Sequence, residues 1–247
     1  MMRQESSLMK FRVIIPARLG STRLPNKPLR EIEGKTLIER VVEQASRSSA
    51  QSVHVATDSQ EIEDLCDQLD INSLMTSREH RTGSDRLAES CNILDLKDEE
   101  LVINVQGDEP FVDPRDIDNL ATLAATKKAK MVTLFTQLTS KESVDSNVVK
   151  IWIDKDNLVD DFSRDINHVN PKNARKHLGI YGYTVSFLRS FVAWNQSNNE
   201  IQRNLEQMRA MDNGEKIYAI ESCGKYHLGV DTESDLQEAR RIAKLTG

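Results

Sequence analysis

Three cationic side chains lie among small residues directly after an apolar run near the start of the chain. The run covers residues 13–17, and the loop after it carries Arg18, Arg23 and Lys27 together with Gly, Ser, Thr and Pro. Small residues let backbone N–H groups approach an anion, and guanidinium and ammonium groups bind phosphate oxygens. A basic surface loop with salt bridges to neighbouring acids is the alternative. The position directly after a strand favours a polyphosphate ligand.

A second phosphate-binding pattern, the P-loop, is incomplete. Gly34, Lys35 and Thr36 match the end of G-x-x-x-x-G-K-[ST], but the first glycine of that motif would fall at Leu29. The triplet precedes a helical pattern and does not follow a strand, although LVINVQGD at 101–108 resembles the motif's acidic partner strand. The sequence therefore disfavours a P-loop.

These loops need a scaffold, and short apolar runs alternate with helical patterns through the first 140 residues. We expect strands at 13–17, 52–57, 101–110 and 131–138 and helices at 36–46, 61–69 and 116–128. This alternation predicts an α/β fold with a parallel, doubly wound sheet. Ligands of such sheets bind at the carboxyl ends of the strands, where the cationic loop lies.

The pattern changes after about residue 145 to a segment rich in polar and aromatic residues. We expect a smaller inserted lobe at about 145–215 within a single domain of residues 1–247. Further helices are expected at 184–194, around 204–211 and at 233–245, with a strand at 216–222.

The composition excludes several function classes. Of 247 residues, 38% are hydrophobic and 29% charged, and the net charge is −6 with a pI near 5.5. Nucleic acid is not an expected partner, because binding it requires clustered Lys and Arg. Cys66, Cys91 and Cys223 form no C-x-x-C pair and are expected to be small buried residues. We expect no membrane insertion and a cytoplasmic location, because no apolar run approaches about 20 residues and residues 1–10 lack a signal-peptide pattern.

Six separated motifs resemble the 3-deoxy-manno-octulosonate (Kdo) cytidylyltransferase family, in family order and across almost the whole chain. They are FRVIIPARLGSTRLPNKPL at 11–29, VATD at 55–58, HRTGSDRLAE at 80–89, NVQGDEP at 104–110, HLGIYGY at 177–183 and GVDTESDL at 229–236. The resemblance implies a Rossmann-like nucleotidyltransferase fold, with a mostly parallel sheet flanked by helices and a lobe for sugar binding and homodimerisation. It also implies Mg²⁺-dependent transfer of CMP from CTP to the anomeric hydroxyl of Kdo, with release of pyrophosphate, for lipopolysaccharide biosynthesis.

The resemblance gives the cationic loop a role in binding the nucleotide. Arg18, Arg23 and Lys27 would bind the triphosphate, with Arg18 and Lys27 also catalytic, while Pro16 and Ala17 would shape the cytosine pocket. Arg18 and Lys27 would neutralise charge on the phosphate oxygens during transfer.

Residues 80–86 resemble the family's H-x-S-G-T-x-R motif near the base and ribose, with the usual Ser and Thr exchanged. The implied nucleotide contacts here are His80, Thr82, Gly83, Ser84 and Arg86. Both hydroxyl groups survive the exchange, so nucleotide choice should survive it too. The alternative is a helix N-terminus with Ser84 as its cap and Asp85 in the first turn.

Asp108, in QGDEP, and Asp231, in GVDT, are the metal ligands and catalytic carboxylates that the resemblance implies. Mg²⁺ prefers oxygen ligands, and one or two carboxylates with water and phosphate suffice. Asp108 follows an apolar strand, and Gly107 beside it permits close approach of a substrate. From spacing alone, turn or helix caps explain both aspartates equally well.

For the sugar acid, the resemblance implies a set of polar and aromatic contacts. They are Gln106, Arg164, His177, Tyr181, Glu200 and Gln207. Arg164 can form a bidentate pair with the sugar carboxylate, and the others can bond hydroxyl groups. The alternatives are that Tyr181 packs in a strand, Glu200 is solvated and Gln207 faces water on a helix.

The chain departs from the family after the F-S-R triplet at 162–164. Family members continue through an I-P-aromatic segment and a longer loop with another arginine, whereas Asp165 and residues 166–168 follow here. This loop borders the implied sugar site, and an acidic Asp165 would suit an amino sugar such as 8-amino-3,8-dideoxy-octulosonate. A non-catalytic nucleotide-binding regulator is a further alternative. The aspartate pair disfavours it, because a protein that only binds nucleotide does not need that pair.

Overall fold

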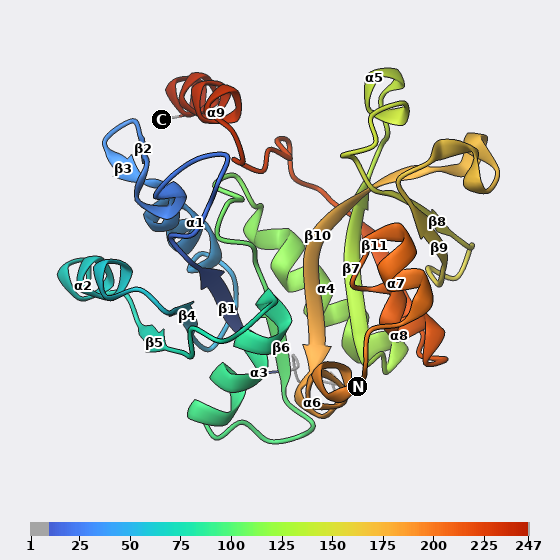
Figure 1. Ribbon diagram of the computed structural model, residues 1–247, viewed down its shortest axis with the longest axis horizontal. Coiled ribbons are helices and arrows are strands. Elements are labelled where there is room, and N and C mark those ends of the chain that lie inside the picture. The colour runs from blue at the N-terminus through green and yellow to red at the C-terminus, as the bar shows by residue number, and fades with distance from the viewer. Residues whose placement is uncertain (1–9, 247) are drawn as a thin grey trace, which may run out of the picture.

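One central sheet contains strands from both halves of the chain, including strands from the range 145–215 that was expected to form a smaller inserted lobe. The computed structural model describes residues 10–246; residues 1–9, part of the segment used for the signal-peptide expectation, lie outside them. The strand order is β11-β7-β10-β6-β1-β4-β5, with β8 and β9 attached beside β10 (Figure 1). The strands are β1 (Phe11–Ala17), β4 (Val53–Thr57), β5 (Ser73–Met75), β6 (Leu101–Asn104), β7 (Met131–Thr136), β8 (Lys150–Ile153), β9 (Val159–Ser163), β10 (Arg175–Thr184) and β11 (Ile217–Glu221).

Most strand pairs of the main path are parallel, as predicted. β1 pairs in parallel with β4 and β6, β4 with β5, and β7 with β11. β10 is antiparallel to both β6 and β7, and its other end pairs with β8. The range 145–215 therefore contributes both the β8–β9 hairpin and a central strand of the sheet.

Helices cover both faces of this sheet. They are α1 (Leu37–Ala45), α2 (Gln60–Gln68), α3 (Gly83–Ile93), α4 (Pro114–Lys127), α5 (Ser140–Ser143), α6 (Val185–Ala193), α7 (Asn198–Arg203), α8 (Met208–Asp212) and α9 (Glu233–Thr246). Side chains alternate along β1: Val13 and Ile15 belong to a core that also contains residues of α1, α2 and α4, while Ile14 belongs to one with residues of α3, α6 and α8. Two apolar cores therefore hold the sheet between layers of helices, which confirms the predicted α/β class.

Local sequence explains several element boundaries. Thr36 is the N-cap of α1 and forms a capping box with Glu39, so the helix begins at Leu37. Gly34 lies in the turn between β2 (Glu31–Ile32) and β3 (Lys35–Thr36) with φ of 76°. The GKT triplet therefore belongs to a hairpin and the N-cap of α1, in agreement with the sequence argument against a P-loop.

The three cysteines differ in their surroundings. Cys66 and Cys91 are buried as expected, whereas Cys223 is exposed, so the prediction is wrong for Cys223. Cys223 lies in the irregular segment after β11, where side chains need not enter a core. No helix in residues 10–246 is long and apolar enough to cross a membrane.

Candidate active site

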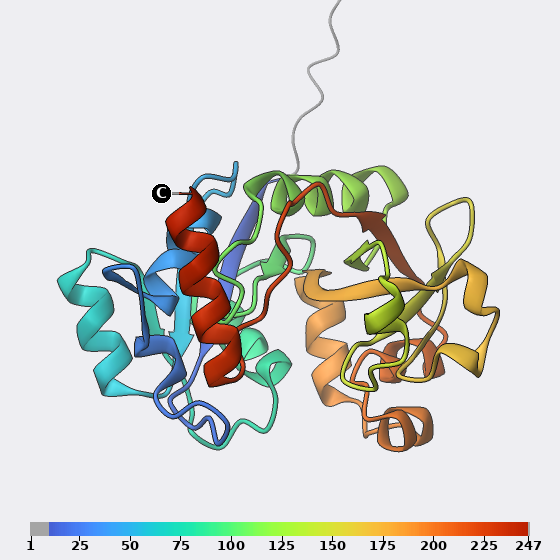
Figure 2. The same cartoon turned by 90° about the horizontal axis from the view of Figure 1, so that it is seen from above.

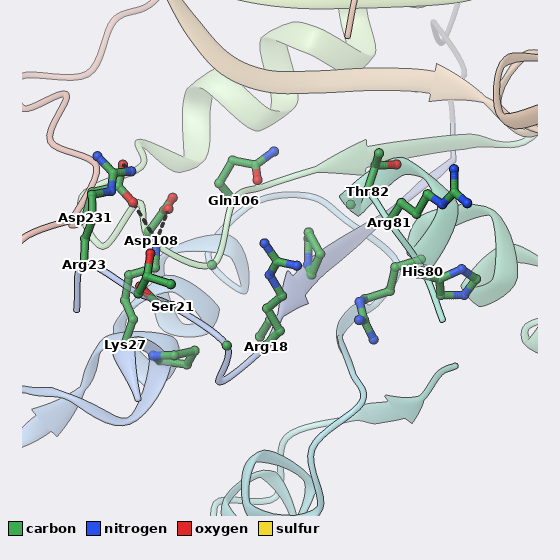
Figure 3. A pocket seen from close by; sticks show the side chains of 18 of the residues that line it. Arg18, Ser21, Arg23, Lys27, His80, Arg81, Thr82, Gln106, Asp108 and Asp231 are labelled. Carbon is green, nitrogen blue, oxygen red and sulfur yellow. Dashed lines mark hydrogen bonds and ion pairs between the residues drawn. The ribbon is translucent and has the colours of Figure 1, made fainter. Parts of the chain in front are cut away.

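A cavity of about 540 Å³ lies at the carboxyl ends of β1 and β6. Figure 3 shows Asp108, Asp231 and Lys27 at one end, Gln106 and Arg18 in the middle, and His80 and Thr82 at the other end. The residues predicted from the sequence that line it are Pro16, Ala17, Arg18, Arg23, Lys27, His80, Thr82, Gly83, Arg86, Gln106, Asp108 and Asp231. Ligand binding at this edge is expected for an open α/β sheet.

Gly107 lets the loop after β6 approach the end of β1. A Cβ atom at Gly107 would lie 2.8 Å from the Pro16 carbonyl oxygen, so a larger residue would push the loop away from the strand. Gly83, the first residue of α3, packs beside the Pro16 ring, where a Cβ atom at Gly83 would lie 3.7 Å from Pro16 Cγ. The close approach therefore depends on Gly107, whereas the contact at Gly83 is an ordinary van der Waals distance.

Lys27 joins the two aspartates, which lie 123 positions apart in the sequence. Lys27 Nζ donates to Asp108 Oδ2 at 2.6 Å and to Asp231 Oδ1 at 2.9 Å, and Arg23 Nη2 lies 3.0 Å from Asp231 Oδ2. Burial lowers the pKa of Lys27, but the two carboxylates outweigh burial and hold that pKa above its ordinary value. Removal from water next to Asp108 raises the pKa of Glu109 to about 7.

The aspartate pair fits the ligand chemistry of a magnesium ion. Both carboxylates contact the same ammonium nitrogen, so one cation can reach an oxygen of each. Residues 10–246 contain no cluster of three or more His, Cys, Asp or Glu side chains with metal-binding geometry. Mg²⁺ does not need one, because water and phosphate oxygens complete its octahedral shell.

The predicted nucleotide contacts at the other end of the cavity are held by neighbouring acids. His80 Nε2 lies 2.6 Å from Glu89 Oε2, which also accepts a hydrogen bond from the Ser77 amide at 2.8 Å. Burial raises the pKa of Glu89, yet these two contacts hold it below its ordinary value. Arg86 is buried and its guanidinium pairs with Asp58 at 2.7 Å. The His80 ring thus has a fixed orientation beside the cavity.

Residues 82–86 do form a helix N-terminus with Asp85 in its first turn, as the alternative expected, but the cap is not Ser84. The N-cap is Thr82, which forms a capping box with Asp85, because the helix already begins at Gly83. Ser84 is 3% exposed and does not line the cavity; its hydroxyl donates to Glu206 Oε2 at 2.9 Å.

Glu206 lines the cavity, although the sequence did not single it out. Its Oε1 is buried without a hydrogen-bond partner, and Arg209 Nη2 lies 3.6 Å away. Burial raises the pKa of Glu206, and the Ser84 hydroxyl opposes that rise. The segment LEQMR offers two adjacent polar residues, and the predicted one, Gln207, is 7% exposed and lies outside the cavity lining. Only the turn before α8 decides which of the two faces the cavity.

Four further residues predicted for sugar binding lie outside the cavity lining, and their role stays a prediction. Arg164 donates to the main-chain oxygens of Ser146, Asn147 and Asn204. His177 contacts the Tyr181 ring, and burial lowers its pKa to about 3.

Glu200, another residue of this group, is 5% exposed, so the alternative that it is solvated is wrong. The alternative that Gln207 faces water is wrong as well, because Gln207 is 7% exposed. Glu200 binds Arg209 through both carboxylate oxygens, at 2.8 and 2.6 Å. Gln106 does line the cavity and donates from Nε2 to the Gly179 carbonyl of β10 at 3.0 Å.

Comparisons with known proteins agree with this geometry. The family model described as cytidylyltransferase matches residues 12–217. The relative named 3-deoxy-manno-octulosonate cytidylyltransferase from Idiomarina loihiensis is 41% identical, over 95% of this chain and 99% of its own. The relative of the same name from Cellvibrio japonicus is also 41% identical, over 96% of this chain and 99% of its own.

Solved structures give the same result. The structure of CMP:2-keto-3-deoxy-manno-octonic acid synthetase complexed with CTP has a TM-score of 0.89 and 33% identity, over 96% of this chain and all of that one. The 4-diphosphocytidyl-2C-methyl-D-erythritol synthase from Anaerococcus prevotii, with a TM-score of 0.62 and 19% identity over 96% of each chain, shares the fold alone. From the family match, the near-complete relatives and the fold, the chain belongs to the 3-deoxy-manno-octulosonate cytidylyltransferase family.

Proposed function

We propose that the protein transfers CMP from CTP to the anomeric hydroxyl of Kdo and releases pyrophosphate. The observation that carries this proposal is the contact of Lys27 with both Asp108 and Asp231 at one end of the cavity. This constellation suits nucleotidyl transfer, in a chain whose relatives bear the name of this reaction.

The reaction requires neutralisation of charge around the α-phosphorus. The anomeric oxygen forms a new bond to the α-phosphorus, and the bond from that phosphorus to the bridging oxygen of the β-phosphate breaks. Arg18, Arg23 and Lys27 line the cavity and would bind phosphate oxygens, which lowers the barrier by stabilising the charge that builds up on them. The N-terminus of α3 at Gly83 adds a partial positive charge beside the cavity.

Asp108 and Asp231 would hold the Mg²⁺ that we include in the proposal. When bound, Mg²⁺ neutralises charge on the phosphate oxygens and orients them. Lys27 and Arg23 lie beside the same carboxylates and would position the triphosphate against them.

The sugar acid would occupy the middle of the cavity. Gln106 and Glu206 line it and carry the amide and carboxylate groups that bond sugar hydroxyls. Asp165, which suggested an amino sugar, lies outside the lining, and its carboxylate accepts a hydrogen bond from the Asn167 amide at 2.9 Å. We therefore propose Kdo as the acceptor. From the family resemblance we add a cytoplasmic homodimer that supplies lipopolysaccharide synthesis.

The test is pyrophosphate release from CTP and Mg²⁺ with Kdo, 8-amino-3,8-dideoxy-octulosonate and other keto-sugar acids. We expect release with Kdo, and a loss of turnover by orders of magnitude in Asp108→Asn and Lys27→Ala. Lys35→Ala is the matched control, because Lys35 pairs with Glu43 and does not line the cavity. Tight CTP binding without release from any sugar acid would support the regulator instead. A preference for the amino sugar would replace Kdo as the acceptor.

A further inference from the structure

Asp231 reaches the active site at the end of a long irregular segment. Residues 222–232 connect β11 to α9 without a helix or strand. Figure 2 shows this connection crossing the middle of the molecule from β11 to α9. Because an irregular segment has no ladder of its own to set its register, its contacts with neighbouring elements must place Asp231 beside Asp108.

A second loop runs antiparallel to this segment. The Val230 amide donates to the Asp108 carbonyl at 2.8 Å, and the Tyr226 and Phe111 ring centroids lie 6.0 Å apart. Farther along, Cys223 contacts the first turn of α4. Residue numbers rise along one loop as they fall along the other. Consecutive Cα atoms are about 3.8 Å apart, so a slip by one residue would remove Asp231 from Lys27.

Asp116, in the first turn of α4, makes directional side-chain contacts with the start of this segment. It is 2% exposed; its Oδ1 accepts a hydrogen bond from the Cys223 amide at 2.8 Å, and its Oδ2 accepts one from the Ser222 hydroxyl. The Cys223 thiol also lies 3.1 Å from Oδ1. The helix N-terminus favours a carboxylate at this position. The segment passes so close that a Cβ atom at Gly224 would lie 3.3 Å from Asp116 Oδ2.

The segment has contacts at both of its ends. The Ser222 amide donates to the Phe135 carbonyl at 2.8 Å, where the segment leaves β11, and Val230 packs in an apolar core beside Asp231. Between these ends the ring contact has no fixed register, and Lys176 Nζ lies 3.5 Å from the His227 carbonyl while it pairs with Glu142 at 2.7 Å. We propose that Asp116 is a positioning residue: it fixes the register of residues 222–231 and thereby holds Asp231 beside Asp108. The consequence for metal binding rests on the proposed Mg²⁺ role of these aspartates.

Asp116→Ala tests the proposal, with Mn²⁺ as the probe. We expect the Mn²⁺ affinity of the CTP-saturated protein, measured by electron paramagnetic resonance, to fall about tenfold or more, as for supporting partners of metal ligands. CTP affinity without metal should change less, because Arg18, Arg23 and Lys27 are untouched. The Val230 amide should exchange its hydrogen faster, which reports the register without any metal.

Asp118→Ala is the matched control on the same helix. Asp118 also accepts hydrogen bonds from a backbone amide and a hydroxyl, both at 2.8 Å, but from Ser49. Asp118→Ala should change neither the Mn²⁺ affinity nor the hydrogen-exchange rate of the Val230 amide. Ser222→Ala removes one donor to Asp116 and should lower Mn²⁺ affinity by a smaller factor. It replaces Asp116→Ala as the test if that variant does not fold.

The outcomes separate the two proposals. The positioning role would be overturned if folded Asp116→Ala kept the wild-type Mn²⁺ affinity and the wild-type exchange rate of the Val230 amide. If Asp116→Ala does not fold, the same result in Ser222→Ala would overturn it. A wild-type protein that binds CTP but no Mn²⁺ would overturn the metal role instead. The Val230 exchange rates of the two aspartate variants would then still decide whether Asp116 positions the segment.

Discussion

Glu200 and Glu206 lie six positions apart and both pair with Arg209, at 2.6 and 3.6 Å, but only Glu206 lines the cavity. Both carboxylate oxygens of Glu200 are bonded to Arg209, away from the cavity, and burial of this pair leaves both side chains about 5% exposed. Glu206 lines the cavity and has one buried oxygen without a hydrogen-bond partner. A buried acceptor of this kind is costly unless a ligand satisfies it. Glu206 is therefore the better candidate for binding a sugar hydroxyl.

Glu206→Gln should raise the KM for the sugar acid about tenfold or more, because a charged hydrogen bond contributes about 1.5–3 kcal/mol. The KM for CTP should change little. Glu200→Gln should instead lower the free energy of unfolding by about 3 kcal/mol, since buried Arg209 then keeps only the longer ion pair with Glu206, at 3.6 Å. Steady-state kinetics and urea unfolding of both variants check this. An unchanged sugar KM in Glu206→Gln would rule out the assigned contact.

His177 should make the protein less stable in acid. Removal of the imidazole from water lowers its pKa to about 3, from an ordinary value of 6.5. Below pH 6.5 the unfolded chain therefore binds a proton that the folded chain does not bind until about pH 3. The free energy of unfolding should fall with pH in this window, by at most about 1.4 kcal/mol per pH unit from this group. His177→Gln should reduce the slope in urea titrations between pH 7 and 4.5; an unchanged slope would contradict the assignment.

At the scale of elements, the spacing of apolar residues and the turn-forming residues predicted those strands and helices that bury one side and expose the other. The strand expected at 101–110 ends at Asn104, because the chain turns at Gln106, whose carbonyl accepts from the Glu109 amide at 3.2 Å. β5 has only three residues, too few for a periodic signal. β10 has a register shift between Leu178 and Tyr181, and pairing with β6 and β7 makes it a central strand. Tertiary pairing of this kind has no local signature.

The same distinction explains which site residues were predictable. Arg18, Lys27 and Asp108 directly follow or lie near strand ends, so the rule for α/β sheets places them together. Asp231 and Glu206 come from irregular segments, and their positions depend on contacts with distant elements. For Asp231 the family motif supplied what periodicity could not, whereas for Glu206 the prediction fell on the next residue along the chain.

The β8–β9 hairpin should depend on Lys150. This lysine is 0% exposed, and its ammonium group donates to the carbonyls of Asp145, Val148 and Arg164 at 2.6, 3.0 and 2.9 Å. Lys150→Met would leave three carbonyls without this donor and should lower the free energy of unfolding by about 2–4 kcal/mol. Exposed Lys155 in the same hairpin is the control, and Lys155→Met should change stability by less than about 0.5 kcal/mol. Equal urea midpoints and slopes for the two variants would refute the prediction.

At the scale of the whole molecule, the C-terminal helix packs on the cationic loop near the N-terminus. A third apolar core joins Leu24, Val230 and Leu236, and these side chains are 1%, 0% and 0% exposed. Leu24 lies between Arg23 and Lys27 in the sequence, and Val230 directly precedes Asp231. This core therefore brings the cations and the carboxylate to the same end of the cavity from opposite ends of the chain.

Leu236→Ala should consequently reduce both stability and nucleotide binding. Truncation of a fully buried leucine lowers the free energy of unfolding by about 2–5 kcal/mol. The loosened core should also weaken CTP affinity, because Arg23 and Lys27 flank Leu24. Leu245→Ala, on the same helix but 68% exposed, should alter both quantities little. Urea unfolding and calorimetric CTP titration measure the two effects. If Leu236→Ala lost stability but kept wild-type CTP affinity, the core would support the fold without positioning the cationic loop.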